Sequence, residues 1–126
     1  MKMKNITLGF IALAALTMPS LADAHHSFAM FDRTKVVSQK GVVREFQWTN
    51  PHSWIQLIVT DASGKTAEWS LEALSPNVHG RWGWKRNSLK PGDKITAYFN
   101  PIRDGSRGGN MVKVTFADGH TIGGGQ

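Results

Sequence analysis

Residues 54–72 read WIQLIVTDASGKTAEWSLE, and this stretch decides the fold. Its first seven residues (54–60) and its last seven (66–72) each place an apolar side chain at every second position. Alternation with a period of two is typical of a strand that buries one face. Between the two segments, Asp61 and Gly64 favour a tight turn. The stretch therefore predicts two strands, and their expected apolar faces carry Ile55, Leu57, Val59, Ala67, Trp69 and Leu71.

Three more strands and one short helix follow from the sequence on either side. We expect strands at 42–48, 94–100 and 111–117, with the glycine-rich residues 104–110 forming a loop before the last of them. Ser75 can cap a helix that begins at Pro76 and runs towards Trp82. The apolar faces expected in the added strands are Val42, Phe46 and Trp48, then Ile95, Ala97 and Phe99, and finally Val112, Val114 and Phe116.

The order of these elements indicates the fold class. Five short strands, a helix between the third and the fourth, and the absence of βαβ spacing predict an all-β protein with a five-stranded OB-like barrel. A plain antiparallel sandwich is the alternative. No internal repeat or long linker divides the sequence, so residues 25–126 are expected to form a single domain.

The first 24 residues have the three parts of a secretory signal peptide. Two lysines lie among residues 1–5, the run 6–18 is largely apolar, and Ala22-Asp23-Ala24 supplies the small residues of a cleavage site. An apolar run of 13 residues is shorter than the roughly 20 that a helix needs to cross a bilayer. We therefore predict a removable signal at 1–24, no membrane span, and a periplasmic or secreted protein.

The composition excludes several classes of function. The chain has no cysteine, so it has neither a disulfide framework nor a thiol nucleophile. There is no Gly-x-Ser-x-Gly motif, and Glu45, Glu68 and Glu72 fall on strand faces without a partner that the sequence identifies, so we do not expect an enzyme. The net charge of +6 favours an anionic ligand or partner. Export makes nucleic acid an improbable natural partner.

Histidines provide the sharpest chemical prediction. Cleavage after Ala24 would make His25 the first residue, and its free amine and imidazole would give two nitrogen ligands next to His26. This arrangement resembles the histidine brace of some exported copper proteins. One more imidazole would complete a nitrogen-rich site that suits copper(II). Cleavage after Ala22 would instead remove the terminal amine from histidine. Candidates for the further ligand are His26, His52, His79 and His120, of which the predicted metal site takes His25, His26 and His52.

Two tryptophan-rich segments are candidates for ligand binding. In residues 48–54, WTNPHSW, Trp54 could offer a stacking surface beside His52; alternatively, Trp48 closes one barrel end and His52 bonds the turn. In residues 81–86, RWGWKR, an indole among cations could hold an anion or a sugar ring; alternatively, Trp82 plugs the barrel. The predicted ligand-binding residues are Trp54, Arg81, Trp84 and Arg86.

These residues lead to two functional hypotheses and a third, weaker one. The first is an exported periplasmic binding or accessory protein that binds copper through its histidines. The second is a metal-free interaction module that docks a protein or glycan through the Trp/Arg surface. In the third, the protein is a scaffold without a small ligand, and Trp48, Trp69 and Trp82 are all core residues.

Several motifs taken together resemble a known family. They are HHSF at 25–28, WTNPHSW at 48–54, SPN at 75–77, GWKR at 83–86 and LKPGD at 89–93. In this order they resemble an uncharacterised family of small exported proteobacterial proteins, which is known as a domain of unknown function. The resemblance covers nearly all of residues 25–126. It implies a single exported domain, and it supplies no activity, cofactor or catalytic residue.

Overall fold

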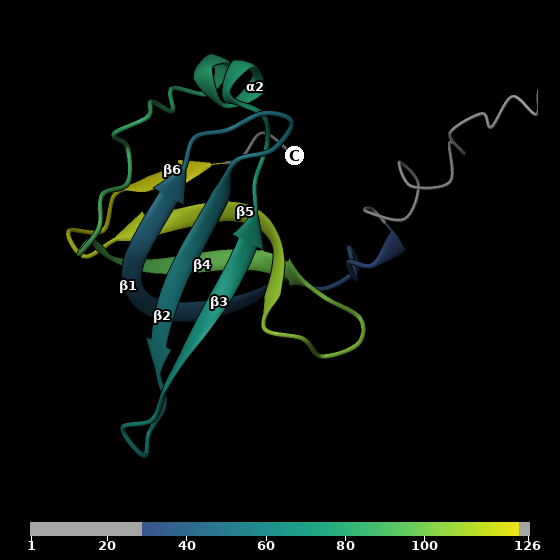
Figure 1. Ribbon diagram of the computed structural model, residues 1–126, viewed down its shortest axis with the longest axis vertical. Helices are drawn as coiled ribbons and strands as arrows, with labels where there is room; N and C mark the ends of the chain where they lie inside the picture. The colour runs from purple at the N-terminus through teal and green to yellow at the C-terminus, as the bar shows by residue number, and fades with distance from the viewer. Residues whose placement is uncertain (1–28, 124–126) are drawn as a thin grey trace, which may run out of the picture.

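Six strands and one short helix follow one another in residues 29–123, which are the residues that the computed structural model describes (Figure 1). The predicted signal peptide, His25 and His26 lie outside the described residues. No helix within residues 29–123 has the length and apolar character needed to span a membrane. The elements are β1 (Val37–Gln47), β2 (Trp54–Thr60), β3 (Thr66–Glu72), α2 (Pro76–Arg81), β4 (Lys94–Pro101), β5 (Gly108–Phe116) and β6 (Thr121–Gly123).

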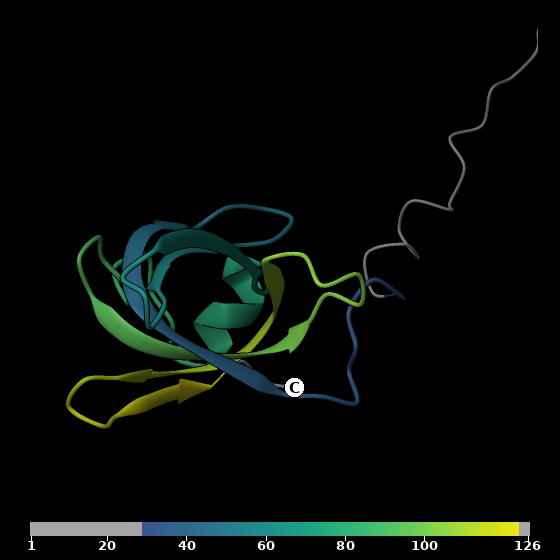
Figure 2. The ribbon, with the colours of Figure 1, turned by 90° about the horizontal axis from the view of Figure 1, so that it is seen from below.

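The strands β1 to β5 close into a barrel. Their order is β3-β2-β1-β4-β5, and a parallel pairing between β3 and β5 closes the ring, which Figure 2 shows from below. The long strand β1 pairs with β4 through Val37–Val42 and with β2 through Val42–Gln47. This connectivity is that of the OB fold. The prediction of an all-β, five-stranded OB-like barrel with one helix between β3 and β4 is confirmed, and β6 is an additional strand on β5.

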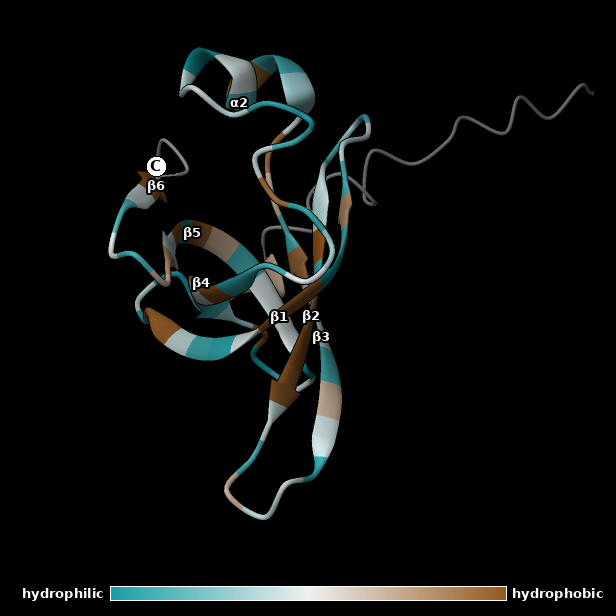
Figure 3. Cartoon of the chain, turned by 90° about the vertical axis from the view of Figure 1, so that its left-hand side faces the viewer, coloured by the Kyte–Doolittle hydropathy of each residue, from teal (hydrophilic) through white to brown (hydrophobic). Residues whose placement is uncertain are grey.

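The barrel interior holds one apolar core. Figure 3 shows hydrophobic residues concentrated in the strands. The expected apolar faces of β2 and β4 are correct, because Ile55, Leu57, Ala97 and Phe99 are fully buried. The complete core consists of Val43, Ile55, Leu57, Leu71, Ala73, Trp84, Leu89, Ile95, Ala97, Phe99, Met111 and Val114.

A β-bulge makes one expected face of β1 wrong. Val42 was predicted to share the apolar face, yet it is 38% exposed, whereas Val43 is only 1% exposed. The register pairs Val43 with Leu57 and Glu45 with Gln56, so Arg44 is an extra residue in β1. An extra residue reverses the alternation. Phe46 therefore packs against the core as predicted, while Val42 does not.

The expected loop at 104–110 is also partly wrong, because its last three residues begin β5. Gly108, Gly109 and Asn110 pair with Ser70, Leu71 and Glu72 of β3, and these contacts close the barrel. Gly108 and Gly109 allow the backbones of β5 and β3 to approach closely and do not form a flexible connection.

Helix α2 closes one end of the barrel. Ser75 Oγ accepts a hydrogen bond from the Val78 N–H at 3.4 Å, so it is the predicted N-cap of a helix that begins at Pro76. Figure 2 shows α2 across the far opening of the ring. Beneath the helix, the rings of His79 and Trp84 lie 5.0 Å apart between centroids, and both side chains are buried.

The roles expected for Trp82 and Trp84 are reversed in the structure. Trp84, predicted to bind ligand, is 2% exposed, and its indole N–H donates to the Gly123 carbonyl at 2.7 Å. Trp82, the candidate barrel plug, is 55% exposed. Between them Gly83 has a φ of 86°, a conformation that favours glycine and turns the chain. The scaffold hypothesis, in which Trp82 is a core residue, is therefore wrong on this point.

Burial of His79 predicts a pH dependence of stability. Its Nε2 accepts the Leu74 N–H at 2.7 Å, and burial lowers its pKa to about 4. The unfolded chain, with an ordinary histidine pKa near 6.5, takes up this proton first. The free energy of unfolding should therefore be insensitive to His79 above about pH 6.5 and fall by up to about 3 kcal/mol as the pH drops to 4.

Urea unfolding at pH 7 and pH 4 measures this loss. In His79→Gln, the side-chain oxygen can still accept the Leu74 N–H, but nothing at position 79 titrates. The variant should lose much less stability between the two pH values than the parent. An equal loss in both proteins would show that His79 is not the responsible group.

Candidate functional site

The β1–β2 loop presents His52 beside a carboxylate. The loop contains the cis Asn50–Pro51 peptide bond, and the Thr49 hydroxyl donates to the His52 carbonyl at 2.9 Å. His52 Nδ1 lies 2.6 Å from Glu72 Oε1, and 36% of the His52 side chain is exposed. The ring is thus held on one side by Glu72 and is open to solvent on part of its surface.

Glu72 determines which nitrogen of His52 is available. Burial raises the pKa of the Glu72 carboxyl, and the neighbouring His52 partly opposes that shift. An ionised carboxylate only accepts hydrogen bonds, so Nδ1 carries the ring proton and donates a hydrogen bond to Glu72 Oε1. The neutral His52 ring then keeps a lone pair on Nε2. A carboxylate behind a histidine is the usual arrangement for histidines that bind metals, because it fixes the ring and raises its basicity.

A row of polar side chains extends from Glu72 across the barrel wall. The register aligns Glu72 with Trp54 of β2 on one side and with Asn110 of β5 on the other, and Asn110 aligns with Asn100 of β4. Their neighbours Ile55 and Leu71 belong to the core, so this row lies on the outer face. Glu72, Asn110 and Asn100 are nevertheless buried, at 9%, 8% and 4% exposure.

The segment before β1 covers the far end of this row. The Asn100 side-chain amide donates to the Lys35 carbonyl at 2.7 Å, and the Asp32 N–H donates to the Pro101 carbonyl at 2.8 Å. Phe31 is buried and forms a β-bridge with Ile102. The N-terminal segment is therefore fixed on the same outer face as the His52–Glu72 pair.

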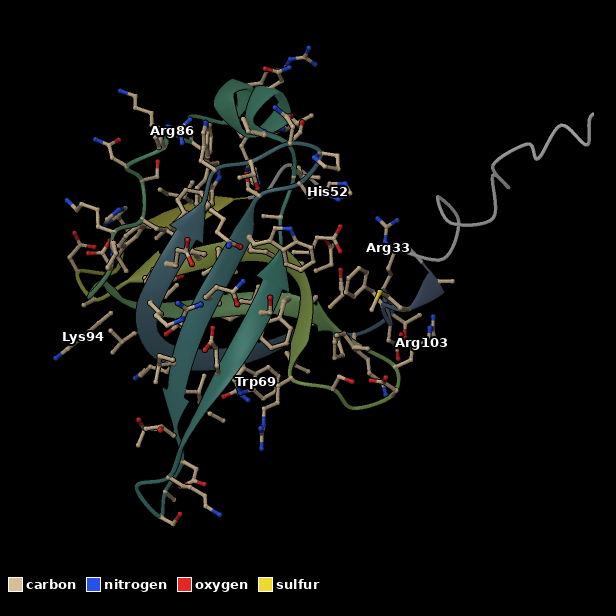
Figure 4. The ribbon with its side chains drawn as sticks, in the orientation of Figure 1. Arg33, His52, Trp69, Arg86, Lys94 and Arg103 are labelled. Carbon is tan, nitrogen blue, oxygen red and sulfur yellow. The ribbon has the colours of Figure 1, made fainter. Side chains whose placement is uncertain are left out.

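The first described residues are held by Arg103. Its backbone N–H donates to the Met30 carbonyl at 2.8 Å, and its side-chain Nε donates to the Ala29 carbonyl at 3.1 Å. Two strand spacings, roughly 10 Å, separate Glu72 on β3 from Asn100 on β4. Figure 4 shows His52, Arg33 and Arg103 on the same side of the molecule. Ala29, at the start of this segment, is thus attached on the side where His52 lies.

The described residues do not form a complete metal site by themselves. Within residues 29–123, no group of three or more His, Cys, Asp or Glu side chains is placed to hold a metal ion. Of the other histidines considered as ligands, His79 is buried under α2. His120 pairs with Asp118 and stacks on Phe116 at 4.1 Å between ring centroids, in the turn between β5 and β6. Neither His79 nor His120 forms a metal-binding group with His52. His25 and His26 lie outside the described residues.

The predicted ligand-binding residues separate into three places. Trp54 is half-buried in β2 next to Glu72, and Trp84 is a core residue. Arg81 and Arg86 are exposed at the α2 end, where Figure 4 shows Arg86 on the opposite side from His52. The structure therefore does not join these four residues into one surface.

Sequence reasoning missed Glu72 as the partner of His52. A signal was available in the strand order, because His52 lies just before β2 and Glu72 is the last residue of β3. In an antiparallel pair the start of one strand lies beside the end of the next. The roles of Asn100 and Asn110 depend on the β3–β5 closure, for which the sequence carries no local signal.

Comparison with known proteins places the chain in a family. The model of a family of unknown function, DUF6152, matches residues 12–112, which is most of the chain. No curated protein and no solved structure matches it. The resemblance to an uncharacterised domain family is thus confirmed. The chain belongs to the family of unknown function DUF6152.

Proposed function

We propose that this is an exported binding protein for copper(II), in which His52 supplies one ligand and His25 and His26 supply the others. The observation that carries the proposal is the contact of 2.6 Å between His52 Nδ1 and Glu72 Oε1 on a half-exposed ring. An exposed histidine is solvated by water and does not need a buried carboxylate as a hydrogen-bond partner. The pair gives His52 the fixed orientation and basic Nε2 of a metal ligand.

The N-terminal segment supports the choice of the other ligands. His26 is three residues before Ala29, so at most about 10 Å of extended chain separates the two. Ala29 is held by Arg103 on the side of the molecule where His52 lies. Imidazole and amine nitrogens favour copper(II) among the divalent first-row metals, and the chain has no cysteine thiolate to select a softer ion.

Export is part of the proposal and has its own measurement. The pattern of residues 1–24 is that of a signal peptide with a cleavage site at Ala22-Asp23-Ala24. The intact mass of the protein recovered from the periplasm or culture medium gives its first residue. A mass that begins at His25 supports the copper site, whereas a mass that begins at Asp23 or at Met1 contradicts the use of the His25 amine as a ligand.

Changes at His52 and Glu72 should weaken copper binding specifically. We expect His52→Ala to lower the affinity for copper(II) at least about 100-fold because a direct ligand is lost. Glu72→Gln should lower it about 10-fold, because the amide can still accept from Nδ1 but no longer raises the basicity of the ring. Isothermal titration with copper(II) in the presence of a competing chelator measures both effects.

His120 provides the matched control. It is also an exposed histidine paired with a carboxylate, that of Asp118, but it lies in the β5–β6 turn. His120→Ala should leave the copper affinity unchanged. Equal binding by the parent and His52→Ala, or an equal loss in His52→Ala and His120→Ala, would contradict the proposed site.

A further inference from the structure

A second surface, separate from His52, lies on α2 and the loop that follows it. We call it the α2 patch, and it consists of Arg81, Trp82, Lys85, Arg86 and Lys90, all of which are exposed. Trp82 is 55% exposed and is the only strongly exposed Phe, Tyr or Trp side chain within residues 29–123. Tryptophan is highly buried on average, so Trp82 differs in exposure from most tryptophans.

The turn after α2 displays Trp82 without needing it for packing. The backbone N–H groups of Trp82 and Trp84 both donate to the His79 carbonyl, at 2.9 and 3.0 Å. Gly83, with its φ of 86°, then directs the following indole into the core. Trp84 therefore packs in the core beneath α2, whereas Trp82 does not belong to the core.

The α2 patch is strongly cationic. Residues 81–92 contain Arg81, Lys85, Arg86 and Lys90 but no aspartate or glutamate. In the part of the chain that the structure describes, the ion pairs of Lys35, Arg44, His52 and His120 involve no residue of the patch. Within residues 29–123, the patch thus combines one exposed indole with four cations that form no ion pair with an acidic side chain.

The position of the patch suits contact with an extended flat surface. Helix α2 lies at one end of the longest axis of the molecule (Figure 1). An end can approach a plane without interference from the rest of the barrel. Arg86 lies on the opposite side of the α2 end from His52 (Figure 4).

We infer that the α2 patch docks the protein on an anionic lipid bilayer. Tryptophan favours the headgroup level of a membrane, where its apolar ring and polar N–H are both satisfied. Each cation near an anionic lipid surface adds attraction, and this attraction falls with added salt. A single indole is too small for the core of a stable protein interface, which buries about 800 Å² on each partner. Charge and size together favour the lipid surface over a protein.

Vesicle flotation with the full exported protein tests the inference. Vesicles of phosphatidylcholine mixed with phosphatidylglycerol should carry the protein at low salt, and vesicles of phosphatidylcholine alone should not. The triple variant Arg81→Gln, Lys85→Gln, Arg86→Gln should bind the anionic vesicles about 100-fold more weakly. Trp82→Ala should bind them about 10-fold more weakly, and Trp82→Phe should retain part of the lost affinity.

A second triple variant separates the patch from the overall charge. Lys40→Gln, Lys65→Gln, Lys94→Gln removes three exposed cations elsewhere on the barrel and should reduce binding much less. Equal losses in the two triple variants would overturn the inference, because net charge alone would then explain the binding. The inference would also be overturned if the parent protein did not bind anionic vesicles but bound an acidic polysaccharide. That result would favour a glycan partner. Copper binding should be the same in all of these variants.

Discussion

Gly109→Ala is expected to destabilise the barrel by about 3 kcal/mol or more, at the upper end of the usual range for overpacked sites. A Cβ at this position would lie 2.3 Å from Cδ2 of Phe99 and 2.5 Å from the carbonyl oxygen of Asn100. Phe99 is fully buried, and the carbonyl belongs to the neighbouring strand. Neither group can move without disturbing the core or the β3–β5 closure, where Gly109 pairs with Leu71.

Gly80→Ala is the matched control for this substitution. A Cβ at Gly80 meets nothing within 4 Å, and Gly80 lies in α2 without a positive φ. The variant should be as stable as the parent or slightly more stable, because alanine favours a helix over glycine. Urea unfolding at pH 7 measures both variants. A loss of less than about 1 kcal/mol in Gly109→Ala would mean that the wall around Gly109 relaxes easily.

The best-predicted strands are those in which the alternation of apolar and polar residues is uninterrupted. The bounds of β2 and β3 agree with the predicted segments 54–60 and 66–72, because each pairs in register along its whole length. In β5, Val112 is an extra residue opposite the Tyr98–Phe99 step, so Met111 faces the core in place of Val112. A period of two cannot be continued through a bulge. The errors in β1 and β5 therefore share one physical cause.

The first half of β1 was not predicted because its own sequence carries little strand pattern. Residues 37–41 read VSQKG, and β4 makes them a strand by pairing with them. Gly41 lies where β1 leaves β4 for β2, and a Cβ there would lie 2.5 Å from the Ile58 carbonyl oxygen. Tertiary pairing and close approach at a barrel corner decide this segment, rather than local propensity.

The candidate site was predictable only in part for a related reason. His52 could be selected from its motif, but Glu72 comes to it through the pairing of β2 with β3. The difference between Trp82 and Trp84 could not be read from residues of equal character, since the turn at Gly83 determines which indole enters the core. Contacts that depend on strand register or on one backbone angle cannot be predicted from the composition of the sequence or from the spacing of its residues.

A protein that begins at His25 should bind one equivalent of copper(II) at least about 100-fold more tightly than the same protein with its terminal amine acetylated. Acetylation converts the amine of His25 into an amide, leaves every imidazole in place, and adds no new amine that could bind copper(II) together with His25 or His26. Loss of a direct ligand should exceed the 10- to 100-fold effect that is typical of losing an outer partner. Titration of both forms with copper(II) at the same pH and chelator concentration measures the difference.

Combining acetylation of the terminal amine with His52→Ala in a double variant tests whether the terminus and His52 hold the same ion. If they do, the double variant should bind little more weakly than the weaker single variant, because effects at one shared site are not additive. Two separate sites would instead give independent losses and more than one equivalent of bound copper. Equal affinity with the free and the acetylated amine would remove the amine from the site. His52, held by Glu72, would then share the copper ion with the imidazoles of His25 and His26 alone.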